Sequence, residues 1–76
     1  MDLLTFTTNF ADQFEETEIS AFTPNTNYKE LEEWSSLIAL SIIAMIDEEY
    51  DVSIKGDDIR SAETIEDLFT IVKNRK

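Results

Sequence analysis

The residues best suited to chemistry in this chain are two adjacent serines, Ser35 and Ser36, at the start of a long apolar helical pattern. The chain has no cysteine and no histidine, so it cannot build a serine triad or a Cys–His pair that would activate a nucleophile. Paired acids such as Glu48 and Glu49 are neighbours in sequence and point in different directions on a helix. We therefore expect a serine that receives a group, in a protein that is not itself an enzyme.

An acidic stretch after this pattern has some features of a calcium-binding loop. Acids alternate from Asp47, and Asp58 falls eleven residues later. Such a loop needs glycine at its sixth position and usually has glutamate at its twelfth, where this chain has Val52 and Asp58. We therefore predict no metal site.

The charge of the chain is strongly negative and unevenly placed. The net charge is −11, and residues 1–54 hold 12 acids against the single base Lys29. A field of this sign repels nucleic acid and anionic membranes and attracts basic protein surfaces. A more ordinary interpretation is that the acids only keep a small apolar domain in solution.

The chain shows neither a membrane-spanning nor a signal-peptide pattern. Its longest apolar run, residues 37–46, is interrupted by Ser41 and is far shorter than the roughly 20 residues that span a bilayer. The first residues lack the basic start of a signal peptide. We therefore expect a cytoplasmic protein without a membrane or nucleic-acid partner, and we expect it to be a monomer.

The spacing of apolar residues predicts an all-α fold in a single domain, residues 1–76. We expect a small four-helix bundle of three principal helices plus a short third helix. The expected helices cover about residues 3–15, 36–50 and 57–61, and a last one begins at Thr64, with Asp67 completing a capping box. Residues 16–34 are predicted to be a long loop whose apolar side chains contact the core: Ile19, Phe22, Tyr28 and Leu31.

The second helix is predicted to be apolar on two faces. One face is a core stripe made of Ala39, Ile42, Ile43, Ile46 and Tyr50. The opposite side mixes apolar residues with carboxylates. Because charged side chains are rarely fully buried, the carboxylates argue against full burial of the helix. We therefore expect a partner-facing surface, the docking face, made of Leu37, Leu40, Ala44, Asp47 and Glu48.

The Ser36-Leu37 pair resembles the attachment site of acyl carrier proteins, which usually have Asp-Ser-Leu at the start of the second helix. Ser35 stands where that family has the aspartate. The likeness continues without a gap over nearly the whole chain. It includes the loop aromatic Tyr28, the acidic segment 47–51, Ile54 in the following link and Thr64-Ile65 at the start of the last helix.

The resemblance implies that Ser36 carries 4′-phosphopantetheine, donated from coenzyme A by a phosphopantetheinyl transferase. The thiol of this arm would hold acyl groups as thioesters for fatty-acid or related biosynthesis. The implied partners are that transferase and acyl-chain synthases and acyltransferases with basic docking surfaces. The apolar positions that would sheath an acyl chain are Ile42, Ile46, Ile54, Ile59, Ala62 and Leu68.

Two alternatives remain open at this point. The chain could be an unmodified acidic helical adaptor that binds a basic protein and uses Ser36 only as a helix N-cap, a role that serine fills well. It could also be a carrier for amino acids or another specialised acid, with the same fold and arm.

Overall fold

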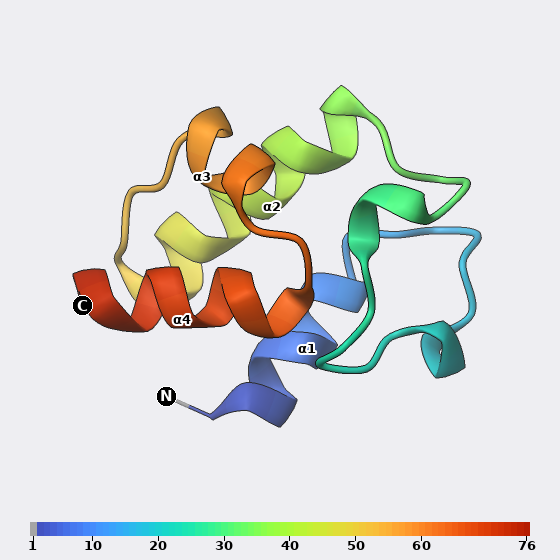
Figure 1. Cartoon of the computed structure of the whole chain (residues 1–76), viewed down its shortest axis with the longest axis horizontal. Coiled ribbons are helices and arrows are strands. Elements are labelled where there is room, and N and C mark those ends of the chain that lie inside the picture. The colour runs from blue at the N-terminus through green and yellow to red at the C-terminus, as the bar shows by residue number, and fades with distance from the viewer. Residues whose placement is uncertain (1) are drawn as a thin grey trace.

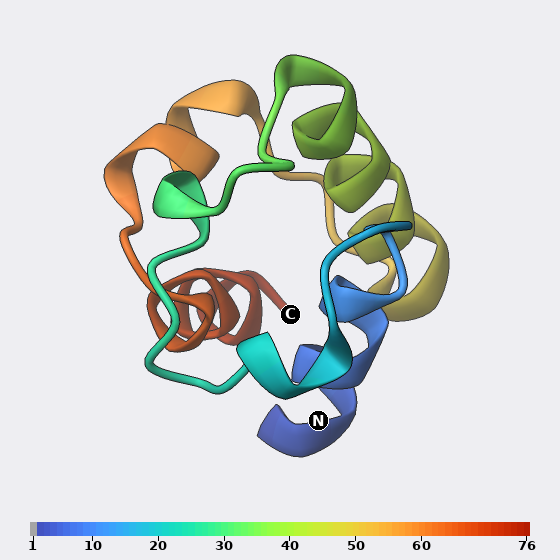
Figure 2. The ribbon, with the colours of Figure 1, turned by 90° about the vertical axis from the view of Figure 1, so that its right-hand side faces the viewer.

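Four α-helices wrap around one core in the computed structural model, which describes residues 2–76 (Figure 1). Their bounds are Leu3–Ala11 for α1, Ser36–Tyr50 for α2, Gly56–Ser61 for α3 and Ile65–Arg75 for α4. Viewed from the side, the helices surround the core, with α2 and α4 on opposite sides (Figure 2). The predicted all-α four-helix fold is confirmed.

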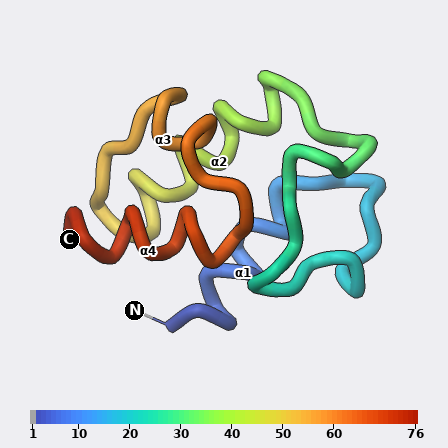
Figure 3. Tube along the Cα trace, in the orientation of Figure 1, coloured from blue at the N-terminus to red at the C-terminus, as the bar shows by residue number. Residues whose placement is uncertain are grey.

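The connection between α1 and α2 is long and contains two short 3₁₀ turns. These are η1, Ile19–Ala21, and η2, Tyr28–Glu30. The connection occupies the side of the molecule away from both chain ends (Figure 3). An isolated antiparallel bridge between Asn27 and Thr64 ties it to the start of α4.

Capping residues fix where the helices begin and end. Ser35 is the N-cap of α2, and its hydroxyl accepts a hydrogen bond from the Ile38 N–H at 3.3 Å. Thr64 and Asp67 form the reciprocal capping box that was predicted for α4. α2 ends at Asp51, which adopts a left-handed conformation with φ 57°. The second helix therefore has the predicted bounds.

The first helix is shorter than predicted, because it ends at Ala11 instead of near residue 15. The N–H groups of Gln13 and Phe14 bond to carbonyls only three residues back, those of Phe10 and Ala11, at 3.1 and 3.0 Å. These tighter turns bend the chain out of the α-helix. Phe14 is still buried, and its ring packs against Phe10 and Phe22 with centroids 5.7 and 4.9 Å apart.

The core is formed mainly by aromatic and branched side chains from all four helices and the connection. The prediction for Ile19 is wrong, because this side chain is 70% exposed. None of the three residues of η1 is buried, whereas Phe22, which follows this turn, is part of the core. Met45, which was not assigned to the core, is buried. The largest fully buried side chains are Phe6, Phe10, Tyr28, Ile42, Ile46, Ile65, Leu68 and Val72.

Tyr28 connects the long connection to the end of α3. Its buried hydroxyl donates to the carbonyls of Ile59 and Ala62, at 2.6 and 3.2 Å. Its ring packs against Phe10 and Trp34, with centroids 5.3 and 4.9 Å apart. Burial raises the pKa of the Tyr28 phenol above its ordinary value, so the hydroxyl stays protonated and remains a donor.

A second polar contact fixes α3 against α4. The Arg75 guanidinium donates to both carboxylate oxygens of Asp58, at 2.5 and 2.6 Å. This bidentate pair lowers the pKa of Asp58 below its ordinary value. Together with Tyr28, it holds the short helix in place on both sides.

Replacing Tyr28 by phenylalanine should lower the free energy of unfolding by about 1–3 kcal/mol, because two buried carbonyls lose their donor while the ring packing is kept. Urea unfolding followed by circular dichroism measures this difference. The control is Tyr50→Phe, which removes a hydroxyl that accepts from the Asn9 amide in a less buried place. Equal losses for the two variants would contradict the role given to Tyr28.

Candidate functional site

The site is built around the first turn of α2, where Ser36 is the first helical residue. Because Ser35 supplies the cap, the Ser36 side chain is not the N-cap, and the interpretation of Ser36 as a helix cap is wrong. The Ser36 residue is exposed to solvent. Its hydroxyl is therefore accessible to another protein.

The helix terminus around Ser36 favours an anion. The first intrahelical backbone bond of α2 runs from the Ala39 N–H to the Ser35 carbonyl. The N–H groups of Ser36 and Leu37 come before this bond and therefore have no partner within the helix. The first turn of α2 contains no acidic residue. No carboxylate in this turn therefore neutralises the positive end of the helix dipole.

A groove of about 430 Å³ lies beside Ser36, between α2 and α3. Residues of α2 line one side of the groove and residues of α3 line the other. Lys29 of η2 and Trp34, before α2, are also part of the lining. The lining combines apolar side chains with four polar or charged residues. It consists of Lys29, Trp34, Ser35, Ser36, Ala39, Leu40, Ile43, Gly56, Ile59 and Arg60.

The predicted acyl-chain positions reach this groove at one point only. Of the six, Ile59 lines it, whereas the other five are buried in the closed core: Ile42, Ile46, Ile54, Ala62 and Leu68. The groove instead uses Ala39 and Ile43, which are half-buried, together with Trp34. Ala39 and Ile43 follow Ser36 by three and seven residues, which places all three along one side of the helix. This spacing in the sequence could have identified the two residues as part of the groove.

Glu33 holds the segment that leads into the site. Its carboxylate accepts three backbone N–H bonds, from Glu15, Glu16 and Thr17, at 2.8, 3.0 and 2.9 Å. It also accepts the Thr17 hydroxyl at 2.7 Å. These bonds lower the pKa of Glu33 below its ordinary value, and the bond from the Glu15 N–H has the largest effect. The segment before Trp34 and Ser35 is thereby attached to the chain that leaves α1.

The predicted docking face lies on the outside of α2. Leu37 and Leu40 are 76% and 61% exposed, and the other three members, Ala44, Asp47 and Glu48, are exposed as well. The structure therefore brings all five residues together on one accessible helix. Two large exposed leucines beside each other form an apolar patch.

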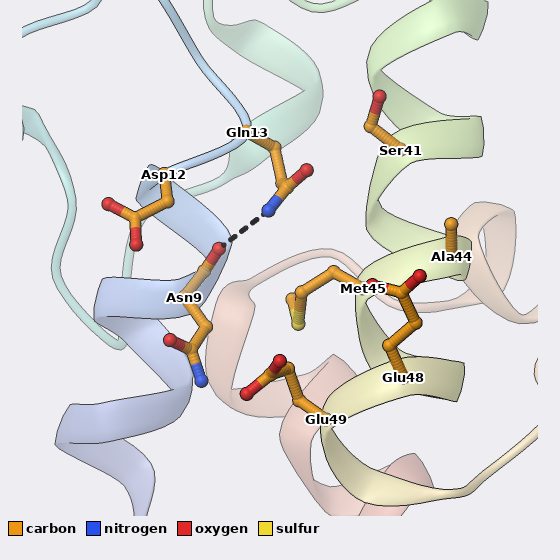
Figure 4. Close-up of a pocket in the computed structure, with 8 residues that line it drawn as sticks. All are labelled: Asn9, Asp12, Gln13, Ser41, Ala44, Met45, Glu48 and Glu49. Carbon is orange, nitrogen blue, oxygen red and sulfur yellow. Dashed lines mark hydrogen bonds between the residues drawn. The ribbon is translucent and has the colours of Figure 1, made fainter.

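A second, acidic groove of about 340 Å³ borders this face, between α1 and α2. In Figure 4, Asn9 and Gln13, at and just after the end of α1, lie opposite Met45 and Glu49 of α2, and Gln13 donates to the Asn9 carbonyl at 3.2 Å. The groove shares Ala44 and Glu48 with the docking face. Its full lining is Asn9, Asp12, Gln13, Ser41, Ala44, Met45, Glu48 and Glu49.

Comparisons with known proteins give no relative: no family model matches the chain, and neither curated proteins nor solved structures match it. Among residues 2–76, no helix is long and apolar enough to cross a membrane.

Replacing Glu33 by glutamine should destabilise the protein at neutral pH, because the amide keeps only one acceptor oxygen and its NH₂ group cannot accept a hydrogen bond from a backbone N–H. The folded pKa is depressed, so this stabilisation is present above the unfolded value near 4.5 and is lost as pH falls through the folded pKa. The difference between wild type and variant should thus shrink in acid.

Urea titrations at neutral and acidic pH measure this effect. Glu32→Gln is the control, since it removes the same charge from an exposed neighbour that makes none of these bonds. A deficit for Glu33→Gln that persists unchanged in acid would contradict the assigned role of the carboxylate.

Proposed function

We propose that this protein is an acyl carrier protein that holds acyl groups as thioesters on a 4′-phosphopantetheine arm attached to Ser36. It would work in the cytoplasm, presenting these groups to enzymes of fatty-acid or related biosynthesis. The chain itself would catalyse nothing. It would position the arm and be recognised by the enzymes that load and unload it.

The arrangement of the two serines carries this proposal. Ser35 takes the capping role, which leaves the exposed Ser36 hydroxyl available at a helix terminus that favours an anion. The same residue is part of the lining of the groove between α2 and α3, which also offers apolar side chains. A phosphodiester with a flexible, partly apolar arm fits these two features together.

The modification needs a separate enzyme, because the chain has neither histidine nor cysteine to activate the serine. The Ser36 oxygen would attack the phosphorus that bears the pantetheine in coenzyme A, and the bond to the adenosine bisphosphate would break. The serine proton would pass to a base of the transferase. The thiol that carries the acyl group would belong to the arm, so a chain without cysteine can serve as a carrier.

Incubation with coenzyme A, magnesium and a broad-specificity phosphopantetheinyl transferase should add one arm, as intact mass spectrometry would show. Ser36→Ala should abolish the addition. Ser35→Ala is the matched control: it should cost about 1 kcal/mol of stability by removing the cap, yet still accept the arm. Addition at Ser35, or none with any transferase including the native one, would contradict the proposal. The second result would favour the adaptor.

The docking face suits brief contacts with several enzymes. Its two exposed leucines supply a small apolar area, and its carboxylates attract a basic surface. Exposed charges of this kind mainly raise the rate of encounter. The proposed partners are the transferase and the acyl-chain synthases and acyltransferases, each contacting the outer side of α2 through basic residues.

Replacing Glu48 by lysine should slow association with the transferase, because it removes a carboxylate that attracts a basic surface. Salt screens such attraction beyond about 8 Å at physiological ionic strength, so the variant's association rate should also depend less on salt. Stopped-flow association at several salt concentrations measures both quantities. Glu18→Lys is the control, with the same change in net charge at an exposed residue of the long connection whose side chain makes no cap bond. Equal effects would mean that only total charge matters.

A further inference from the structure

The two grooves on either side of α2 carry opposite charge. Among the ten residues that line the groove beside Ser36, the charged ones are Lys29 and Arg60. The groove between α1 and α2 instead contains three carboxylates, those of Asp12, Glu48 and Glu49. The first is therefore a cationic groove and the second an acidic groove. In a chain with 17 acids and only six bases, the cationic groove is a distinct local feature.

The docking face lies between the two grooves. Leu40 belongs to the docking face and also lines the cationic groove. Ala44 follows one turn later on the same side of α2, and it also lines the acidic groove. A partner that covers the exposed Leu37 and Leu40 therefore contacts the edges of both grooves.

The charged groups of the cationic groove are available to a partner. Arg60 pairs with Asp57, but their side chains are 73% and 85% exposed, so the pair is weakly held and exchanges readily. The Lys29 ammonium has three N–H donors, and its contact with the Arg60 carbonyl, at 2.9 Å, uses one of them. Both side chains can therefore bind a carboxylate of another protein.

The charged groups of the acidic groove are available as well. Asp12 is an exposed residue at the C-cap of α1, outside the docking face. Glu49 is exposed on α2 and lies opposite the end of α1 (Figure 4). The acidic side of the surface thus extends from α2 onto α1.

A partner that is basic over its whole contact surface fits only one of these sides. It would be attracted by the acidic groove and repelled by Lys29 and Arg60, since like charges that face each other across an interface weaken binding. A partner with both signs of charge, placed in the matching direction, is attracted on both sides. Turned by half a turn about the normal to the docking face, the same partner is repelled on both sides.

We infer that the docking face binds a partner surface of two signs, with acidic side chains opposite Lys29 and Arg60 and basic side chains opposite Asp12 and Glu49. This inference rests on the proposed binding of partner enzymes to the docking face, and it adds how they are oriented. Ser36 lines the cationic groove, so the acidic part of the partner surface lies beside the entrance to the partner's active site. The two charged sides thereby direct that entrance toward Ser36.

The variant Arg60→Glu gives the sharpest test, because it makes the chain more negative. A partner that is basic throughout would associate faster with this variant. The partner inferred here should instead associate about threefold more slowly at low salt, because an attractive contact becomes repulsive. Stopped-flow association with the phosphopantetheinyl transferase of the native cells measures the rate. The Arg60 side chain is 73% exposed, so the fold should be kept, which circular dichroism checks.

A charge exchange at constant net charge separates orientation from total charge. Arg60→Glu/Asp12→Lys leaves the net charge at −11 and weakens both sides at once, so association should be about tenfold slower than in the wild type. The control Lys73→Glu/Glu18→Lys makes the same exchange at exposed residues that are not among those lining the grooves. It should keep the wild-type rate.

The outcomes separate this inference from the function on which it rests. An unchanged or faster rate for Arg60→Glu, or equal rates for the two exchange variants, would overturn the partner of two signs and leave the carrier function intact. A wild-type protein that neither associates with the transferase nor receives an arm would overturn both.

Discussion

The hydrogen bonds from the Tyr28 hydroxyl to the end of α3 are the contacts on which the site most depends. They join the long connection to a helix of only six residues, which has little stability of its own. The same tyrosine ring packs on Trp34, two residues before the serine. One buried side chain therefore sets the position of α3 and of the segment leading into α2, and so defines both sides of the groove.

Glu33 complements this arrangement from the other direction. Its carboxylate collects the free N–H groups of the chain that leaves α1, which otherwise would need water or another acceptor. A connection of this length would normally be variable in conformation. Tyr28 in the interior and Glu33 nearer the surface give it defined contacts at both ends of the segment that precedes Ser35.

The distribution of charge along α2 is compatible with the proposed binding of several partner enzymes. The helix begins with serines and apolar residues next to a groove with two cations, and it ends with the acids of its docking face. Attraction of a basic partner would thus act away from Ser36, the proposed attachment residue. The groove surface beside Ser36 is neutral or cationic. Under the proposed function, this separation would let partner encounter and modification involve different parts of one helix.

Local patterns predicted the helices well because local bonds define them. α2 follows from its apolar spacing and the serines at its start, and α4 from the Thr64–Asp67 box. Features that depend on distant contacts were missed: Glu33 bonds residues 16 to 18 positions away, and the Tyr28 bonds to α3 span more than thirty. The exposure of Ile19 was also missed, because a single 3₁₀ turn has no apolar period that separates it from the buried Phe22.

The central claim, that Ser36 is the residue through which the protein carries its cargo, is tested most directly by the intact mass of the protein purified from its native cells. The account predicts a phosphopantetheine adduct that maps to Ser36, with any acyl group still attached adding its own mass. Protein that is wholly unmodified, or modified at Ser35 instead, would contradict it.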